Sequence, residues 1–388
     1  MKKLMALLLA VMLAFSLFAC KGAASTPAAT DEATAEATSA PAPEETAATA
    51  EKKVYNVVSL VNGNLGDKSF FDSAESGLKS LQDAGRITYK TIEMGPTDEA
   101  KWLETLYEVA ASGEYDLVIC GTWQMPEHLK EVATEYPDQK FLIYDDASYV
   151  GANQNVVNMT YRQNDMGYLV GVFAAAMTSE TSVAGINADK VVGFVGGEDS
   201  PVINDFLYGF LEGVQATDPE VKVDTRYVTN YYDTSAAKEL ALSMIKDKYC
   251  DIIWGVAGQA GNGAAEAAFE TKKAYFIGVD SDQELTLSTD LAAITLTSGL
   301  KNIGQSLIWF FDEWDAGRTY WGQEINLGLL EGGVGIVTDK NFATLVPQAV
   351  QDKVLAAEAA VRDGSIKVST AIGDTTNGAA ALREAMQP

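Results

Sequence analysis

The stretch that decides the fold lies late in the chain, where residues 274–283 read AYFIGVDSDQ. An apolar run that stops at acidic residues is typical of a buried parallel strand whose carboxyl end opens into a cleft. Residues 141–146, FLIYDD, have the same apolar run and the same acidic end. The two stretches predict two similar lobes, with Asp145 and Asp280 at the ends of matched strands.

The segments around these strands also repeat, which indicates duplication of a whole lobe. Residues 191–197 repeat the strand and glycine turn of residues 54–63, and residues 250–255 match residues 115–121. Strands alternate with helical patterns in both halves, which favours parallel sheets with helical crossovers. The predicted fold class is α/β: two Rossmann-like lobes with parallel sheets, joined by a hinge, with a ligand in the cleft between them.

The composition divides the chain into a leader, a linker and a folded part. Two lysines and an apolar run end at Ala19-Cys20, the pattern of a secretory signal with a bacterial lipoprotein cleavage box, so Cys20 is the expected lipidation site. An uncleaved signal anchor is the alternative. Residues 21–53 are rich in Ala, Thr, Pro and Glu and have no aromatic residue, so we expect a disordered tether.

Within the folded part, the repeat sets the expected lobe boundaries. The first lobe should cover residues 54–160, with a returning segment near residues 290–325. The second should cover residues 161–289 and be completed by about residues 326–388. We also expect an edge hairpin around residues 328–336.

The composition argues against several classes of function. The chain of 388 residues has a single histidine, His128, which disfavours Ser-His-Asp or Cys-His catalysis and removes the commonest zinc ligand. A formal net charge of −26 disfavours a nucleic-acid partner, which would need a basic surface. We therefore expect a protein that is not an enzyme and that needs no metal and no cofactor. Cys120 and Cys250 lie in apolar runs, which favours buried thiols, with a disulfide as the alternative.

Polar and aromatic residues follow the matched strands. Carboxylates at such positions can accept hydrogen bonds from two adjacent hydroxyl groups, as sugars and riboses present them. The alternative is that these acids cap the following helices. The candidates are Asn62, Trp123 and Asp145 in the first lobe and Gly258, Asp280 and Asp282 in the second.

Aromatic residues begin equivalent helices in the two lobes. Phe70 or Phe71 starts a helix in the first lobe, where Ser69 is the expected N-cap, and Phe206 starts its counterpart in the second. Two rings that approach from opposite lobes would form a slot for a flat heterocycle. The alternative is that these rings belong to the core.

Two further features belong to the second half of the cleft. Residues 258–263, GQAGNG, precede a helical pattern, so their N–H groups could receive an anion or a hydroxyl group, although a plain tight turn would look the same. Lys301 could reach a ribose oxygen or pair with Asp280. A surface lysine is the alternative.

These residues resemble the basic membrane protein family, the PnrA-like nucleoside-binding lipoproteins that serve as substrate-binding components of ABC importers. The resemblance runs over about residues 54–337. It rests on DKSF at 67–70, GYLVG at 167–171, GFVGG at 193–197, AGQAGNG at 257–263, IGVDSDQ at 277–283 and TSGLK at 297–301.

The resemblance implies a type I periplasmic-binding-protein fold and a purine nucleoside as ligand. By motif match, Phe70 and Phe206 would enclose the base, Asp145 would bond to it, and Asp280 and Lys301 would hold the ribose. Asn62 stands where the family usually has an aspartate.

The resemblance also implies partners and a location. It predicts an ABC permease as partner, a lipid anchor facing the extracytoplasmic side of the cell membrane, and a monomer. Two alternatives stay open. The same fold could bind a sugar, an amino acid or a signal molecule as receptor or sensor, or Asp280 and Asp282 could activate water in a nucleoside hydrolase.

Overall fold

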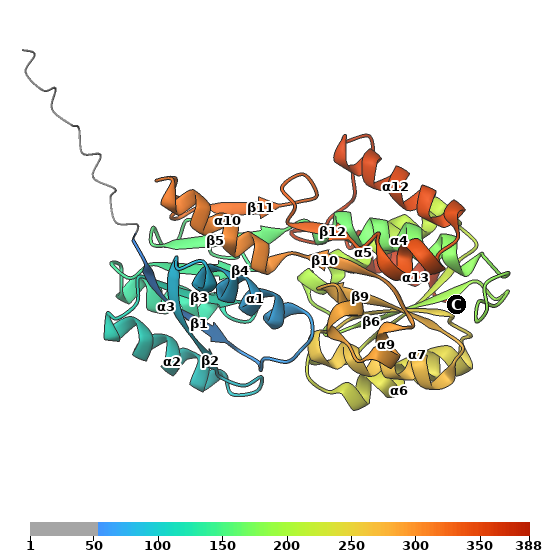
Figure 1. The fold of residues 1–388 in the computed structure, drawn as a ribbon, viewed down its shortest axis with the longest axis horizontal. Helices are drawn as coiled ribbons and strands as arrows, with labels where there is room; N and C mark the ends of the chain where they lie inside the picture. The colour runs from blue at the N-terminus through green and yellow to red at the C-terminus, as the bar shows by residue number, and fades with distance from the viewer. Residues whose placement is uncertain (1–52) are drawn as a thin grey trace, which may run out of the picture. The chain divides into compact units, whose positions relative to one another are not determined.

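The computed structural model describes residues 53–388, so the predicted leader, Cys20 and nearly all of the tether lie outside the described residues. Two six-stranded sheets form the centres of two lobes, and helices cover both faces of each sheet (Figure 1). Within residues 53–388, no helix is both long enough and apolar enough to cross a membrane.

The first lobe is built on a fully parallel sheet with the strand order β11-β5-β4-β3-β1-β2. Strands β3 and β4 are buried along their whole length, as expected for a parallel sheet between two helical layers. The strands are β1 (Tyr55–Val61), β2 (Ile87–Glu93), β3 (Leu117–Gly121), β4 (Phe141–Tyr144), β5 (Val156–Tyr161) and β11 (Glu324–Leu327). The helices are α1 (Phe70–Asp83), α2 (Glu99–Ser112), α3 (Pro126–Glu135) and α10 (Ile303–Asp315).

The second lobe has the strand order β12-β10-β9-β8-β6-β7, in which β12 alone runs antiparallel to its neighbour. Its strands are β6 (Val191–Gly196), β7 (Lys222–Tyr227), β8 (Ile252–Val256), β9 (Tyr275–Asp280), β10 (Thr295–Lys301) and β12 (Val334–Ile336). Its helices are α4 (Gln163–Thr178), α5 (Pro201–Thr217), α6 (Thr234–Asp247), the 3₁₀ turn η1 (Gly258–Ala260), α7 (Gly261–Thr271), α8 (Gln283–Thr286), α9 (Thr289–Ala292), α11 (Lys340–Leu345), α12 (Gln348–Arg362) and α13 (Gly378–Met386).

The two sheets correspond strand for strand. The order in the first sheet matches the order in the second when β1 is paired with β6, β3 with β8 and β4 with β9. The predicted fold class is confirmed. Cys120 and Cys250 are both buried free thiols, which confirms the interpretation of the two cysteines as core residues.

The chain passes between the lobes after β5, after β10 and after β11. Strand β10 pairs with β9, so residues 295–301 belong to the second sheet and the chain returns to the first lobe only after Lys301. Helix α10 then packs on α1 in the first lobe (Figure 1). The return therefore begins later than the expected segment near residues 290–325, because β10 is needed to continue the second sheet.

The expected hairpin around residues 328–336 is wrong. Strand β11 pairs with β5 in the first sheet, whereas β12 pairs with β10 in the second. A tight turn does lie between them, in which Gly333 N donates to Gly328 O at 2.9 Å. The glycine-rich pattern marks the third crossing between the lobes, and this crossing looks like a hairpin turn in sequence.

Glycines allow helices α4 and α5 to pack backbone against backbone. A Cβ atom at Gly209 would lie 2.0 Å from the carbonyl oxygen of Asn164, and one at Gly167 would lie 2.3 Å from that of Phe206. Every residue of α4 is buried, so this helix is central to the second lobe. The equivalent contact in the first lobe joins Gly77 of α1 to Gly304 of α10.

The C-terminal segment packs along α5. Asp205 Oδ1 accepts hydrogen bonds from Thr370 Oγ1 at 2.6 Å and from Ala371 N at 2.7 Å. Further along, Arg383 Nη1 donates to the hydroxyl of Tyr227 at 2.8 Å. The C-terminal segment is therefore attached both to α5, which begins beside the cleft, and to the last residue of β7.

We expect Gly209→Ala to lower the free energy of unfolding by about 1–3 kcal/mol, because the added methyl group overpacks a contact between backbones. Gly335→Ala is the matched control, since the nearest atom to a Cβ there is 3.9 Å away. Urea unfolding of both variants measures the difference. Equal stability of the two variants would contradict the importance of the α4–α5 contact.

Candidate functional site

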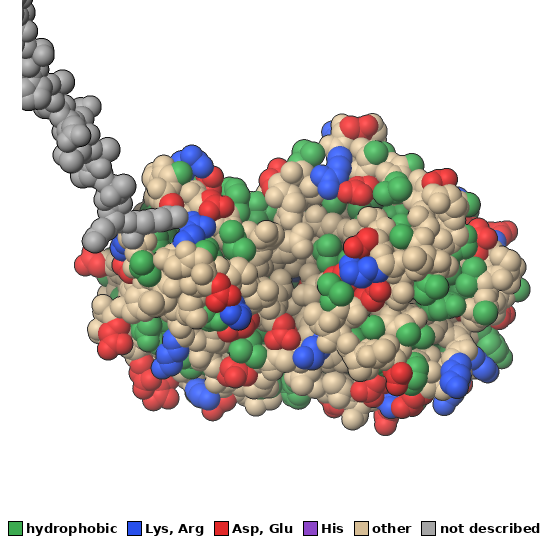
Figure 2. All heavy atoms as spheres, viewed as in Figure 1, with side chains coloured by type: hydrophobic (Ala, Val, Ile, Leu, Met, Phe, Trp, Pro, Cys, Tyr) green, Lys and Arg blue, Asp and Glu red, His purple; other side chains and the backbone are tan. Residues whose placement is uncertain are grey.

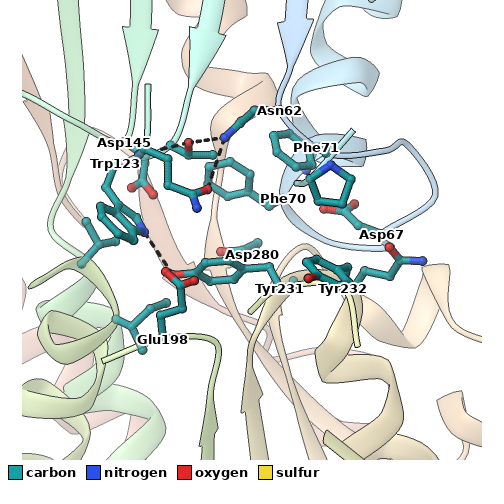
Figure 3. A pocket seen from close by; sticks show the side chains of 18 of the residues that line it. Asn62, Asp67, Phe70, Phe71, Trp123, Asp145, Glu198, Tyr231, Tyr232 and Asp280 are labelled. Carbon is teal, nitrogen blue, oxygen red and sulfur yellow. Dashed lines mark hydrogen bonds between the residues drawn. The ribbon is translucent and has the colours of Figure 1, made fainter. Parts of the chain in front are cut away.

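A cavity lies between the carboxyl ends of the two sheets (Figure 3). It contains about 930 Å³ of empty space, part of which is open to solvent. The space-filling view shows a hollow between the lobes, with acidic and basic side chains dispersed over both lobes on this face (Figure 2). Segments that follow parallel strands of both sheets line the cavity.

The structure brings most of the predicted site residues together at this cavity. Nine of the ten candidates line it: Asn62, Phe70, Phe71, Trp123, Asp145, Phe206, Gly258, Asp280 and Lys301. Asp282 does not line it, because the chain turns into α8 after Ser281 and Asp282 Oδ2 accepts from Lys340 Nζ at 2.8 Å. The structure therefore places Asp282 outside the cavity, apart from the other nine candidates.

Asp145 and Asp280 occupy equivalent positions in the two lobes. Asp145 follows β4 and has φ 71°, and Asp280 ends β9 with φ 63°, so both adopt the left-handed conformation that is uncommon for residues other than glycine. Their exposed fractions are only 8% and 6%. Two buried carboxyl groups in strained backbone at a cavity are a combination typical of functional sites.

Lys301 forms a buried ion pair with Asp145, not with Asp280. Its Nζ lies 2.5 Å from Asp145 Oδ1, and the Lys301 side chain is 1% exposed. The pair joins the end of β10 in the second sheet to the end of β4 in the first. The alternative interpretation of Lys301 as a surface lysine is excluded by its burial.

Aromatic rings complete the surroundings of the Lys301 ammonium group. Nζ lies 4.6 Å from the ring centre of Phe206, 5.7 Å from that of Phe70 and 5.6 Å from that of Tyr161. Such contacts stabilise a desolvated cation. Phe70 and Phe206 come from opposite lobes, so the ammonium group lies beside both walls of the predicted aromatic slot.

Burial and neighbouring charges determine the ionisation of the cleft acids. Burial raises the pKa of Asp280 to about 7, Lys301 opposes this rise, and Asp145 adds to it. Burial also raises the pKa of Asp145, again opposed by Lys301. Near neutral pH, Asp280 is therefore present in both forms, so its carboxyl group can donate or accept a hydrogen bond to a ligand hydroxyl.

The start of α1 is capped by Asp67, which corrects the prediction for Ser69. Ser69 occupies the N-cap position but makes no side-chain cap. Asp67 instead accepts from the backbone N–H groups of Ser69, Phe71 and Asp72, at 3.1, 2.8 and 3.1 Å. A carboxylate with three N–H donors satisfies the free end of the helix better than one hydroxyl could.

The same loop contacts the second lobe through its backbone carbonyl groups. Asn262 Nδ2 donates to Asp67 O at 3.2 Å, Thr286 Oγ1 to Lys68 O at 2.9 Å, and Ser281 Oγ to Ser69 O at 2.9 Å. These hydrogen bonds hold the two lobes together along one side of the cavity.

The opposite end of the cavity contains residues that the sequence analysis missed. Trp123 Nε1 donates to the hydroxyl of Tyr231 at 3.2 Å, which links the lobes there (Figure 3). Tyr231 and Glu198 also line the cavity. Both follow strand ends, after β7 and β6, so the rule that selected Asp145 could have identified them had it been applied to every strand.

We expect Lys301→Met to lower the free energy of unfolding by about 3–5 kcal/mol, because it leaves the Asp145 carboxylate buried without a counter-ion. The double variant Lys301→Met/Asp145→Asn removes both charges and should recover most of this loss. Urea unfolding of the two single variants and the double variant provides the measurement. If the double variant is no more stable than Lys301→Met, the ion pair is not the cause.

Comparison with known proteins places the chain among transporter components. A family model described as "ABC transporter substrate-binding protein PnrA-like" matches residues 54–368. The chain is 30% identical over 281 residues to basic membrane protein A of Borreliella burgdorferi, covering 72% of this chain and 78% of the relative. It is 27% identical over 325 residues to the ABC transporter nucleoside-binding protein BmpA of Lactococcus lactis subsp. cremoris, covering 80% and 88%.

Solved structures agree with this assignment. A solute-binding protein of an ABC transporter system from Aeropyrum pernix K1 has a TM-score of 0.66 at 27% identity and covers 85% of this chain and 90% of its own. A further one from Conexibacter woesei has a TM-score of 0.63 at 22% identity, covering 82% and 99%, and supports the fold alone. The chain belongs to the PnrA-like family of ABC transporter substrate-binding proteins, which are binding proteins rather than enzymes.

Proposed function

We propose that this protein is the lipid-anchored nucleoside receptor of an ABC importer, which binds a purine nucleoside in the interlobe cavity and delivers it to the permease. The observation that carries the proposal is the pairing of Phe70 and Phe206, from opposite lobes, beside the buried group of Asp145, Asp280 and Lys301. A nucleoside has a flat base and a ribose with two adjacent hydroxyl groups, and this cavity offers matching surfaces for both parts.

The aromatic walls suit the base. Phe70 meets Phe71 edge to face, with ring centres 5.2 Å apart, and Phe206 is supported by Trp254 at 6.0 Å. Rings that are fixed by their neighbours lose little side-chain entropy when a base stacks on them. Stacking of a base on an aromatic ring contributes about 1–3 kcal/mol per base in proteins that bind single-stranded nucleic acids.

The charged group suits the ribose. Asp280 can accept or donate a hydrogen bond near neutral pH, and the Lys301 ammonium group has further N–H donors besides the one bonded to Asp145. Gly258, with φ 53°, begins the turn before α7 on the same side of the cavity. In the Lactococcus lactis relative, the printed name itself describes nucleoside binding.

Closure of the lobes on the ligand is part of the proposal. Lys301 is the last residue of β10, immediately before one of the crossings between the lobes, and its partner Asp145 belongs to the other lobe. Trp123 and Tyr231 make a second link across the cavity. Ligand contacts that join both lobes stabilise the closed form, which a permease can distinguish from the open one.

A hydrolase is not favoured by the arrangement of acids. The hydrolase alternative relied on Asp280 and Asp282 acting together, and Asp282 lies against Lys340 outside the cavity. The role of this site is binding.

The membrane attachment rests on sequence. Cys20 follows the apolar leader, and residues 21–53 provide a tether to the folded part on the extracytoplasmic side. We propose a monomer that is held by lipid on Cys20.

For the anchor, we expect Cys20→Ala to move the protein from the membrane fraction to the soluble extracytoplasmic fraction when it is expressed in a bacterium. The lipid is attached through the thiol, so alanine removes the attachment site. Immunoblotting of the fractions measures the change, with Ser39→Ala in the tether as control. Retention of Cys20→Ala in membranes would contradict lipidation at this residue.

For the ligand, we expect calorimetric titration with purine nucleosides to show saturable binding. In Asp280→Ala this binding should weaken at least tenfold, because a hydrogen bond to a charged group contributes about 1.5–3 kcal/mol. Asp282→Ala is the matched control, because that carboxylate lies nearby in sequence but outside the cavity. Binding of a sugar or amino acid instead of nucleosides would overturn the proposal, and release of free base from inosine would make the protein a hydrolase.

A further inference from the structure

Glu198 brings an unsatisfied carboxylate to the cavity. It follows β6 in the second lobe, lines the cavity and reaches into it near Trp123 (Figure 3). Within residues 53–388, its side chain has no hydrogen bond and no ion pair, and burial alone raises its pKa. A half-buried acid without a protein partner is available to a ligand.

Asn62 brings a second unsatisfied acceptor from the first lobe. Its side chain is 4% exposed, and its Nδ2 donates to Thr122 Oγ1 at 2.9 Å and to Gln124 Oε1 at 3.3 Å. These bonds leave Oδ1 buried and without a partner among the described residues. Because a buried acceptor without a donor is unfavourable, a ligand that donates to it gains affinity.

The strand order places both acceptors at the far end of the cavity from Lys301. In the second sheet, β6 and β10 are separated by β8 and β9, which at the usual strand spacing sets their ends roughly 14 Å apart. In the first sheet, β1, which precedes Asn62, is separated from β4, which precedes Asp145, by β3. A ligand with its hydroxyl groups at Asp280 and Lys301 therefore presents its other end to Asn62 and Glu198.

The two unsatisfied acceptors share the far end of the cavity with a donor that is already used. The indole N–H of Trp123 is directed to the hydroxyl of Tyr231. Burial raises the pKa of Tyr231, and the nearby charge of Glu198 adds to this rise, so the carboxylate and this pair lie in one neighbourhood. The Glu198 carboxylate and Asn62 Oδ1 therefore favour a ligand that supplies N–H donors to this end, and the carboxylate would repel an anionic group there.

We propose that Glu198, assisted by Asn62, makes this protein select nucleosides whose base presents two adjacent N–H donors, as guanine does with its N1–H and 2-amino groups. The inference rests on the proposed nucleoside-binding function. A carboxylate accepts two parallel N–H bonds in bidentate geometry, and the second hydrogen of the amino group is free for Asn62 Oδ1. Inosine has the same ring and ribose but lacks the amino group.

The test is calorimetric titration of guanosine and inosine into the wild-type protein, Glu198→Gln and Glu239→Gln. We expect the wild type to bind guanosine at least tenfold more tightly than inosine, and Glu198→Gln to reduce this ratio to about threefold or less, because charged hydrogen bonds are roughly twice as strong as neutral ones. Glu239→Gln makes the same chemical change at an exposed position of α6 outside the cavity and should keep the wild-type ratio.

The outcomes separate this inference from the proposed function. Equal binding of guanosine and inosine by the wild type, an unchanged ratio in Glu198→Gln, or equal weakening of both ligands in that variant would each overturn the role of Glu198 while leaving nucleoside binding intact. If the wild type binds neither nucleoside, both proposals are overturned. Thermal unfolding without ligand checks the fold of Glu198→Gln, which loses no hydrogen bond and no ion pair within the described residues and should unfold like the wild type.

Discussion

Parallel strands of one sheet all end at the same edge, and this constraint produces the site. Because the carboxyl ends of both sheets face one cavity, side chains that are distant in sequence meet there without any special loop. Asn62, Asp145, Glu198 and Asp280 each occur within two residues of a strand end. The two sheets thus determine where the polar groups lie, and the short segments after the strands determine which side chains are present there.

The ion pair of Lys301 and Asp145 links the position of the polar groups in the cavity to the position of one lobe relative to the other. A buried ammonium group needs a nearby carboxylate, and here the carboxylate belongs to the other lobe. Separation of the lobes would expose both charges to water, which solvates them well. The pair is therefore compatible with an open form and a closed form of the protein. Its net contribution to the stability of the closed form depends on which groups replace water when the lobes close.

The sequence predicted the fold and most of the cavity because both depend on local patterns. Apolar runs with polar ends identified β4 and β9, and the repeat identified their equivalence. Contacts between lobes leave no such pattern, so the partner of Lys301 was misassigned and Tyr231 was missed. The turn at Gly328 was misread for a related reason: a tight glycine turn looks the same whether the next strand pairs with the preceding one or joins another sheet.

Because the C-terminal segment is attached to α5, one wall of the cavity depends on residues that lie outside the cavity. Asp205 is 1% exposed, burial raises its pKa to about 6, and Thr370 and Ala371 satisfy its carboxylate. Its neighbour in sequence is Phe206, a wall of the cavity, while the family model ends at residue 368. The segment after residue 368 thus supports the helical turn that carries Phe206 without itself lining the cavity.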